Sequence, residues 1–385
     1  MEGRKIKILY LIDYLHGFGG TERHLFYLAT KLNKMGFECT VCALRYHHEI
    51  VDHFKNKGIH VITAPVVRIY DFDGLKQILS LVKFVKSENI DIIQSFNVDS
   101  DIVASLVSRL SGKSVVVSSR RDLGGYRKKR HHVFIKLFCR NIQNYLAVCD
   151  AVASDMITRE SVNPDRITTI YNGIELNGWS ENEVDLQSLR DKYQLSAKTF
   201  LIGNVSHLRP EKGHPDFIKA ISYLKDKIAD MKIFIIGGGG NPALRESYEK
   251  LAWELGLSDK IIFTGYQKDI QTWLSLLNVC CLTPIRNEGF SNALLEQMLL
   301  GKAIIATDVG GNKEALIHSV SGVIVPPGDS QAIADAIFQL YQDKGLRAKL
   351  EAAAKKRVTT EFSMNKMINA MENYYSKILA ISNFN

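Results

Sequence analysis

The first half of the chain alternates short β-rich runs with stretches of helical periodicity. Between the runs, apolar residues recur three and four positions apart, as at Leu25, Leu28 and Leu32, which is typical of an amphipathic helix. An alternation of this kind predicts a parallel sheet covered by helices on both faces. The predicted strands span residues 5–13, 38–44, 60–66, 91–96, 114–119 and 144–149.

A second series of the same kind starts afresh at residue 199, after the polar stretch 178–193. Its predicted helices include 243–256, 291–300 and 330–343, and its predicted strands span 199–206, 232–240, 260–265, 278–284, 303–308 and 322–326. The sequence therefore predicts an α/β protein of two doubly wound parallel-sheet domains, residues 1–180 and 190–360. We expect a C-terminal helix, within 364–385, to pack back on the first domain, because no strand of the second follows it.

Composition is consistent with two globular domains in a cytoplasmic protein. The chain has 385 residues, of which 46% are hydrophobic and 23% charged, so each domain is long enough to bury a core. No apolar run reaches the roughly 18 residues that cross a bilayer, and the charged start leads into a strand rather than a signal-peptide core. Six scattered cysteines indicate packed, reduced thiols, and we assign no metal or redox role to Cys39-x-x-Cys42.

The chain has a net charge of +8, and its positive charge is concentrated in one segment. From Arg109 to Arg140 there are ten Lys or Arg and one acid, Asp122. Such a segment favours an anionic partner, either a phosphate, an acidic lipid surface or nucleic acid, although a solvated helix face would look similar. Because apolar residues interleave with the charges from Arg120 to Arg140, we expect docking on the inner face of the cytoplasmic membrane. Nucleic acid is disfavoured because aromatic stacking motifs are missing.

One loop of interest follows the first strand of each domain. It is glycine-rich in the first domain and basic in the second. In the first domain, Gly17-Phe-Gly19-Gly20 opens a helix with Thr21 placed to cap it, an arrangement that suits an oxyanion. Glu22 stands where a dinucleotide fingerprint needs its third glycine, which argues against a nicotinamide dehydrogenase. In the second domain, Arg209 and Lys212 can converge on a diphosphate.

The run NEGFSNALLE, residues 287–296, places one glutamate in a loop and another one turn into a helix. Ser291 or Asn292 can cap that helix, and the amides of Gly289, Phe290, Ser291 and Asn292 can receive a phosphate or sugar oxygen. A carboxylate accepts two hydrogen bonds side by side, which suits neighbouring hydroxyls of a sugar. We therefore expect Glu296 to hold one diol, of a ribose or a hexose, and Glu288 another.

These motifs resemble those of the retaining glycosyltransferases of family 4 (glycosyltransferase group 1), which have the GT-B fold of two facing Rossmann-like domains. The resemblance rests on EGFSNALLEQM, LRPEKG, TDVGGNKEAL and GGTERH and covers essentially the whole chain. It implies a metal-independent hexosyltransferase without a cofactor. Its donor would be a nucleotide sugar, and its acceptor a lipid-linked or cell-surface glycan intermediate of polysaccharide biosynthesis.

The resemblance also implies roles for single residues. Glu296 would hold the ribose, Glu288 the donor sugar, Lys212 the diphosphate, and the amides near Gly19 and Gly20 would meet the diphosphate from the other domain. The acceptor hydroxyl would lose its proton to the leaving phosphate, with retention of configuration. Contacts with the nucleotide base of the donor are expected near residues 237–240 and 265–268.

Two positions depart from the family's pattern. His207 occupies the place of a frequent arginine, so Arg209 is the expected substitute. Arg121 stands where a histidine is frequent, and because a guanidinium cannot act as a base, an acidic or phosphorylated acceptor is favoured.

Alternatives from other classes stay open. Asp71-x-Asp73 and Asp99-x-Asp101 have the spacing of a metal-binding motif, but 99–101 is also typical of a helix start. A GT-B sugar-nucleotide epimerase or phosphorylase would share these motifs without needing a separate acceptor. A non-catalytic nucleotide-sugar binder would also share them.

Overall fold

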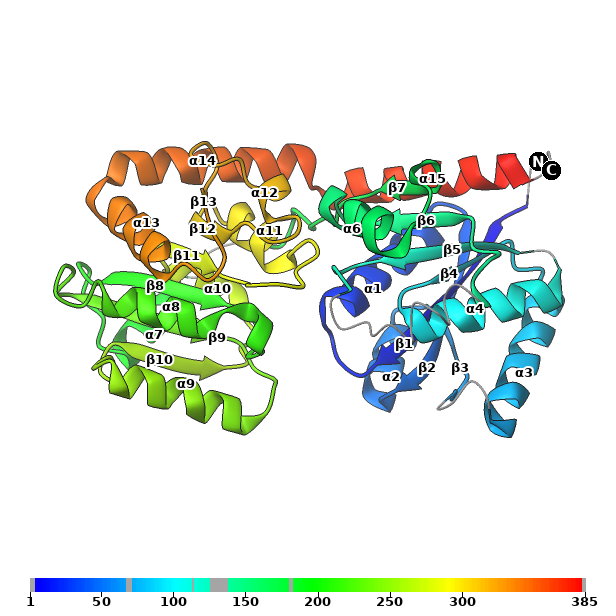
Figure 1. Ribbon diagram of the computed structural model, residues 1–385, viewed down its shortest axis with the longest axis horizontal. Helices are drawn as coiled ribbons and strands as arrows, with labels where there is room; N and C mark the ends of the chain where they lie inside the picture. The colour runs from blue at the N-terminus through cyan, green and yellow to red at the C-terminus, as the bar shows by residue number, and fades with distance from the viewer. Residues whose placement is uncertain (1–3, 67–70, 113, 125–137, 180–182, 383–385) are drawn as a thin grey trace. The chain divides into compact units, whose positions relative to one another are not determined.

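The computed structural model describes residues 4–66, 71–112, 114–124, 138–179 and 183–382. These residues divide into two compact units, unit 1 (Met1–Asn172 with Asn365–Asn385) and unit 2 (Gly173–Met364). Each unit is built around one parallel sheet (Figure 1). No helix within the described ranges is long and apolar enough to cross a membrane.

The sheet of unit 1 has seven strands within the described residues, in the order β3-β2-β1-β4-β5-β6-β7. Its strands are β1 (Ile6–Leu15), β2 (Phe37–Tyr46), β3 (His60–Thr63), β4 (Ile92–Ser95), β5 (Val115–Arg120), β6 (Asn144–Ala147) and β7 (Ile167–Thr169). Its helices are α1 (Gly20–Asn33), α2 (His48–Asn56), α3 (Phe72–Glu88), α4 (Val98–Ser111), α6 (Asp150–Glu160), the 3-10 turn η1 (Pro164–Arg166) and α15 (Met364–Ser382). The apolar runs of β1 and β4 are covered on both faces, as a parallel sheet requires.

The sheet of unit 2 has six strands within the described residues, in the order β10-β9-β8-β11-β12-β13. Its strands are β8 (Phe200–Val205), β9 (Met231–Ile236), β10 (Ile261–Gly265), β11 (Val279–Leu282), β12 (Ala303–Thr307) and β13 (Val323–Val325). Its helices are α7 (Glu183–Lys192), η2 (Pro210–Lys212), α8 (His214–Ser222), α9 (Pro242–Glu254), α10 (Ile270–Leu276), α11 (Asn292–Leu299), α12 (Asn312–Ala315), α13 (Ser330–Gln342) and α14 (Lys344–Glu361). The two doubly wound sheets confirm the predicted fold class.

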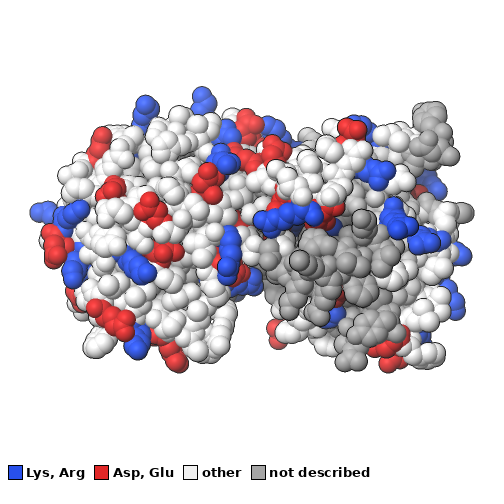
Figure 2. Space-filling model, in the orientation of Figure 1, with Lys and Arg blue, Asp and Glu red and all other residues white. Residues whose placement is uncertain are grey.

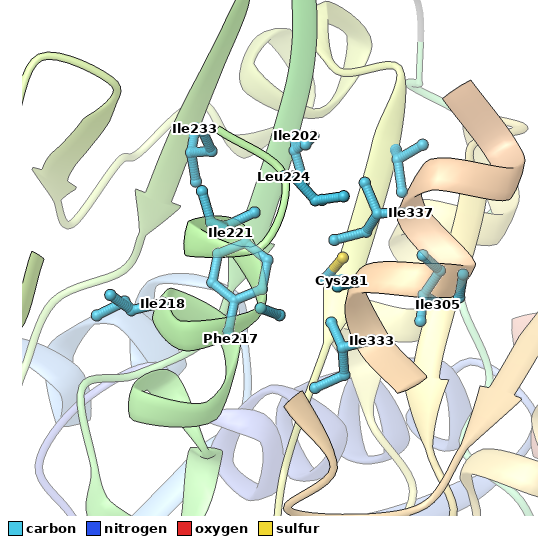
Figure 3. Packing of buried hydrophobic residues seen from close by; sticks show 14 of the residues in the cluster. Ile202, Phe217, Ile218, Ile221, Leu224, Ile233, Cys281, Ile305, Ile333 and Ile337 are labelled. Atoms are coloured by element: carbon cyan, nitrogen blue, oxygen red, sulfur yellow. The ribbon is translucent and has the colours of Figure 1, made fainter. Parts of the chain in front are cut away.

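The core of unit 2 shows how the sheet fixes the loops that follow its strands. Ile202 on β8, Cys281 on β11 and Ile305 on β12 face Phe217 of α8 and Ile337 of α13 (Figure 3). All five side chains are essentially inaccessible to solvent. The strands are therefore rigidly spaced, and the loops at their carboxyl ends start from fixed points.

The last helix, α15, belongs to unit 1. Tyr375 is fully buried and donates its hydroxyl to Gln94 Oε1 on β4, while its Oη lies 3.3 Å from Tyr10 Oη on β1. Its ring also lies 6.2 Å from that of Phe37, measured between centroids. The chain therefore leaves unit 1 at Asn172, builds unit 2, and returns to cover the first sheet.

Candidate functional site

The candidate site of unit 2 lies where its strand order reverses. β8 is flanked by β9 on one side and by β11 on the other, so the crossovers leave β8 and β11 in opposite directions. In doubly wound sheets the carboxyl ends of such strands leave room for a ligand. The loop after β8 carries Arg209 and Lys212, and the loop after β11 carries Glu288.

Lys212 and Glu288 form an ion pair across these two loops. Lys212 Nζ donates to Glu288 Oε2 at 2.7 Å, and 19% and 11% of the two side chains are exposed. The loops are also joined through their backbones, because Ile285 N donates to Glu211 O at 2.8 Å. The structure thus brings two predicted site residues together. A diphosphate bound by Lys212 would compete with Glu288 for the ammonium group.

Hydrogen bonds among polar side chains in the interior of unit 2 hold the loop that carries Lys212 in place. Asn204 Nδ2 donates to Thr283 Oγ1 at 3.0 Å, and Thr283 Oγ1 donates to Lys212 O at 3.3 Å. Ser206 Oγ donates to Asn204 Oδ1 and lies 3.1 Å from His214 Nε2. Burial, with a smaller contribution from Lys212, lowers the pKa of His214 to about 4, so its imidazole is neutral at pH 7. These residues belong to no sequence motif and were not predicted.

The Glu288 loop is held by the turn that follows β12. Gly311 N donates to Gly289 O at 2.7 Å. Gly310 has a φ of +57°, and a Cβ at this position would collide with the carbonyl oxygen of Glu288. A glycine is therefore required here for both conformation and space. Phe290 is buried next to Phe362, with ring centroids 5.1 Å apart.

Helix α11 begins at Asn292, with Ser291 at the N-cap position, but the Ser291 hydroxyl makes no capping hydrogen bond. The first backbone N–H groups of a helix have no partner within the helix, which suits the predicted contact with an oxygen of a ligand. Glu296 lies one turn further on and is only 4% exposed. Glu296 is therefore a buried acid and not a surface charge, and its contact with a ribose stays a prediction.

Arg209 and His207 differ in their surroundings. Arg209 is exposed, and its guanidinium makes no hydrogen bond or ion pair with the described residues. His207 Nδ1 lies 3.0 Å from Gly238 O, so the ring is bound to the glycine turn after β9. Of these two, Arg209 has the side chain that can reach an anion.

The glycine loop of unit 1 leads into α1, but Thr21 does not cap this helix, and that prediction is wrong. Gly19 takes the N-cap position with extended backbone angles, Gly20 is the first helical residue, and Arg23 N donates to Gly19 O at 3.0 Å. Glycine is accepted at an N-cap, so the helix starts earlier than the threonine suggested.

Arg120 and Arg121 have opposite environments, which corrects the expected surface position of Arg120. Arg120 is 1% exposed and binds Asp101 and Glu160, the latter at 3.0 Å. It is a buried structural cation and cannot belong to a docking surface. The remaining segment expected to dock on lipid falls mainly on residues 125–137, outside the described residues.

Arg121 is partly buried and donates to Asn172 Oδ1. Burial lowers its pKa to about 10, so the guanidinium keeps its charge at pH 7. The negative charges of Asp122 and Glu22 act in the opposite direction and favour the charged guanidinium. Burial, with a contribution from Arg121, also lowers the pKa of the buried His24, so the neighbouring imidazole is neutral.

Asp13 is a buried acid of unit 1 that the sequence analysis did not single out. Its carboxylate accepts from Ser100 N at 2.6 Å and from Asp99 N at 3.2 Å, at the start of α4. Burial, together with the charge of Asp99, raises the pKa of Asp13 to about 7 despite these hydrogen bonds. Asp13 thus ties β1 to α4.

The two Asp-x-Asp motifs have structural roles. Asp71 accepts from Gly74 N at 2.7 Å as the N-cap of α3. Asp99 pairs with Arg45 at 2.9 Å, and Asp101 accepts from Ser118 and Arg120. Among the described residues, no three His, Cys, Asp or Glu side chains gather as metal ligands would.

Comparisons with known proteins agree on the family. The family model "Glycosyl transferases group 1" matches residues 185–357, and "Glycosyltransferase Family 4" matches residues 18–177. The chain is 24% identical to the capsular polysaccharide biosynthesis glycosyltransferase CapM of Staphylococcus aureus, over 85% of this chain and 87% of that protein. It is 22% identical to the UDP-Gal:alpha-D-GlcNAc-diphosphoundecaprenol alpha-1,3-galactosyltransferase of Escherichia coli, over 78% and 79% of the two chains.

Solved structures of similar fold include a glycosyltransferase from Rickettsia africae, with a TM-score of 0.88 and 21% identity over 97% of this chain and 99% of that one. Anabaena HepE, solved with UDP and glucose, has a TM-score of 0.86 and 21% identity over 97% and 100% of the two chains. The solved structures show the GT-B fold. The two family models, one in each unit, show that the chain belongs to the group 1, family 4 glycosyltransferases, enzymes that transfer a sugar from a nucleotide-sugar donor.

Proposed function

We propose that this glycosyltransferase is a metal-independent hexosyltransferase that retains anomeric configuration and acts on a lipid-linked glycan precursor at the inner face of the cytoplasmic membrane. The observation that carries the proposal is the Lys212–Glu288 pair at the carboxyl ends of β8 and β11, with the buried Glu296 one turn into the next helix. A cation and two carboxylates in this order fit a diphosphate flanked by two sugars.

In this proposal each charged residue of the candidate site in unit 2 has one role. Lys212 and the exposed Arg209 neutralise the diphosphate, Glu288 accepts from hydroxyls of the donor sugar, and Glu296 accepts from the ribose. As the bond between the anomeric carbon and the phosphate oxygen breaks, the acceptor oxygen bonds to the same face of that carbon. Its proton passes to the leaving phosphate. Preorganised cations at the leaving group would supply much of the rate enhancement.

In unit 1 we assign Arg121 to an anionic group of the acceptor. Its guanidinium is charged and partly accessible, it donates to the neutral amide of Asn172, and the charges of Asp122 and Glu22 favour its charged form. The acceptor named for the Escherichia coli relative carries a diphosphate and a lipid, which is the kind of molecule that such a cation would bind. The amides of Gly19 and Gly20 are proposed as further phosphate contacts.

A thermal-shift screen tests the donor assignment. UDP, GDP, ADP, CMP and their sugar conjugates are added to the wild type and to Glu296→Ala. A ligand at about 100 times its Kd raises the free energy of unfolding by about 2.7 kcal/mol. We expect one nucleoside diphosphate to raise the melting temperature of the wild type, and much less that of Glu296→Ala. If none raises it, the donor roles of this site are wrong.

The acceptor assignment has a separate test. Once the donor is known, Arg121→Gln should raise KM for an acceptor that carries a phosphate while leaving the thermal shift by the donor unchanged. An unchanged KM would remove Arg121 from the acceptor site. Incubation with donor alone, with and without inorganic phosphate, separates transfer from epimerisation or phosphorolysis, since only the latter two consume donor without an acceptor.

A further inference from the structure

Three exposed aromatic rings stand together where β1 and β2 of unit 1 end. The imidazoles of His16 and His47 are stacked, with their centroids 4.4 Å apart and their planes 25° from parallel. The Tyr14 ring meets His16 edge to face, with centroids 5.4 Å apart. Tyr14 is 46% exposed, and both histidines are exposed as well. We call these three residues the ring platform.

Contacts with the neighbouring strand and with α4 hold the ring platform in place. The strand register sets Tyr14 next to Arg45. The Arg45 guanidinium lies 4.9 Å from the centroid of the Tyr14 ring and bonds to Asp99 at 2.9 Å. His47 N donates to Leu15 O at 3.0 Å, which joins the loops after the two strands. The rings are therefore presented to solvent on a fixed backbone.

The ring platform lies where the strand order of unit 1 reverses. β1 is flanked by β2 on one side and by β4 on the other, and doubly wound sheets bind ligands at the carboxyl ends of such strands. The loop after β1 then continues to Gly19 and Gly20, a few residues further on, whose amides we assigned to a phosphate. A ligand with its phosphate at these amides would have its next group close to the rings.

We propose that the ring platform binds the sugar ring of the acceptor, so that the acceptor is a pyranoside and not an open-chain acid or polyol. One face of a pyranose carries C–H groups, which pack on the electron-rich face of an aromatic ring. Its hydroxyls bond to groups that both donate and accept, such as a phenol and a neutral imidazole. Within the described residues no hydrogen bond engages the Tyr14 hydroxyl or the ring nitrogens of His16 and His47.

The charge of the ring platform suits an uncharged sugar ring. Burial, with contributions from His47 and Arg45, lowers the pKa of His16, so its imidazole is neutral at pH 7. The Arg45 guanidinium, the cation next to the platform, is paired with Asp99. The anionic part of the acceptor is therefore left to Arg121 and to the glycine amides, and the rings are left to the sugar.

Two other ligands fit the ring platform less well. Stacked imidazoles direct their lone pairs within two nearly parallel planes, so these lone pairs do not converge on one metal ion as ligands must. Among the described residues, no three His, Cys, Asp or Glu side chains gather as metal ligands either. A nucleobase also stacks on aromatic rings, but the base contacts of the donor are expected in unit 2. The experiments include a nucleoside for this reason.

The inference deepens the proposed function and rests on it, because it assumes that unit 1 binds the acceptor. Its tests measure saccharide binding without any donor. They can therefore fail while the donor site of unit 2 stands, and the donor screen can fail while these tests succeed.

The first experiment is saturation-transfer difference NMR on the full chain. The probes are the methyl α-glycosides of glucose, galactose and N-acetylglucosamine, with sorbitol as the open-chain control and uridine as the nucleoside. All are uncharged, so the interspersed basic and acidic side chains that Figure 2 shows over unit 2 should not attract them. We expect at least one glycoside to receive saturation, mainly at the C–H groups of one ring face. No response from any glycoside, or an equal response from sorbitol, would overturn the proposal.

The second experiment removes rings. Tyr14→Ala should weaken glycoside binding about tenfold, His16→Ala should act in the same direction, and Tyr14→Trp should keep the affinity because an aromatic face remains. The matched control is Tyr223→Ala, since Tyr223 follows α8 in unit 2 and is also 46% exposed, and it should bind as the wild type does. Unchanged binding in Tyr14→Ala, or an equal loss in Tyr223→Ala, would place the sugar elsewhere. If uridine were the probe that depends on Tyr14, the platform would be a nucleobase site instead.

A kinetic measurement then links the ring platform to transfer. Tyr14→Ala should raise KM for the acceptor about tenfold and leave the thermal shift by the donor as in the wild type. An unchanged KM would show that the platform does not hold the acceptor.

Discussion

The Lys212–Glu288 pair links stability to activity at single residues. Lys212→Met leaves the Glu288 carboxylate without its 2.7 Å partner, in a position that is 8% exposed. We expect the free energy of unfolding to fall by about 1–3 kcal/mol. We expect kcat to fall at least about 100-fold, because the charge that we propose for the leaving group is lost. Urea denaturation and steady-state kinetics measure the two effects.

The double variant Lys212→Met, Glu288→Gln is the control for this prediction. It removes both charges, so the buried carboxylate is no longer unpaired and part of the lost stability should return. Activity should not return with it. If stability fell by the sum of the single effects, the two side chains would not be coupled as the structure shows.

Asp13 makes the stability of unit 1 depend on pH. Its pKa is raised to about 7 by burial, whereas an unfolded chain loses this proton near pH 3.9. Between these values the folded state holds the proton and the unfolded state does not. The free energy of unfolding therefore falls as pH rises, by up to about 1.4 kcal/mol per pH unit. Asp13→Asn should flatten this slope between pH 5 and pH 7 in urea denaturation.

The corresponding change at an exposed acid of unit 2, Asp226→Asn, controls for a general loss of negative charge. It should leave the slope as in the wild type. An unaltered slope in Asp13→Asn would mean that the two backbone N–H groups of α4 keep this carboxylate ionised in the folded protein, against the effect of burial.

At the scale of elements, the turn after β12 sets the position of the Glu288 loop. Gly310→Ala places a Cβ against the carbonyl oxygen of Glu288, so the loop must move. Gly328→Ala is a matched control, because Gly328 also has a positive φ, of +74°, but has open space around its Cβ position. Both variants should lose about 1 kcal/mol of stability from the backbone. Only Gly310→Ala should also lose donor binding, measured by thermal shift with the donor. Equal donor binding in the two would contradict the positioning role.

The strands could be predicted from the sequence better than the contacts between them. Every strand with a clear apolar run was predicted to within a few residues, whereas β7, of only three residues, was missed because Ile167–Thr169 contains a single large apolar side chain. The motif residues of the candidate site were proposed from their spacing and from the family resemblance, and their roles stay predictions. Lys212 and Glu288 are 76 positions apart in the sequence, and Asp13 is more than 80 positions from the residues of α4 that it binds. No local sequence pattern predicts such contacts. The adjacent Arg120 and Arg121 look alike in sequence, and only the pairing of β5 separates a buried cation from an accessible one.

At the scale of the whole molecule, the chain crosses between units twice, near Asn172 and near Met364. Because α15 covers strands of unit 1, the stability of the first sheet depends on the last residues of the chain. Each unit has its own core, so we expect them to unfold as separate cooperative transitions. A substitution in α15 should therefore lower only the transition of unit 1.

Two neighbouring tyrosines of α15 test this dependence. Tyr375→Phe removes a buried hydroxyl that donates to Gln94 and lies beside Tyr10, and should cost about 1–3 kcal/mol because the Gln94 oxygen loses its partner. Tyr374 is also buried, but its hydroxyl has no hydrogen-bond partner among the described residues, so Tyr374→Phe should be neutral or slightly stabilising. Hydrogen exchange followed by mass spectrometry assigns each effect to a unit. Faster exchange in β1 and β4 with unit 2 unchanged is the expected result for Tyr375→Phe. Equal loss of protection in both units would show that they unfold together, and the separate transitions would have to be given up.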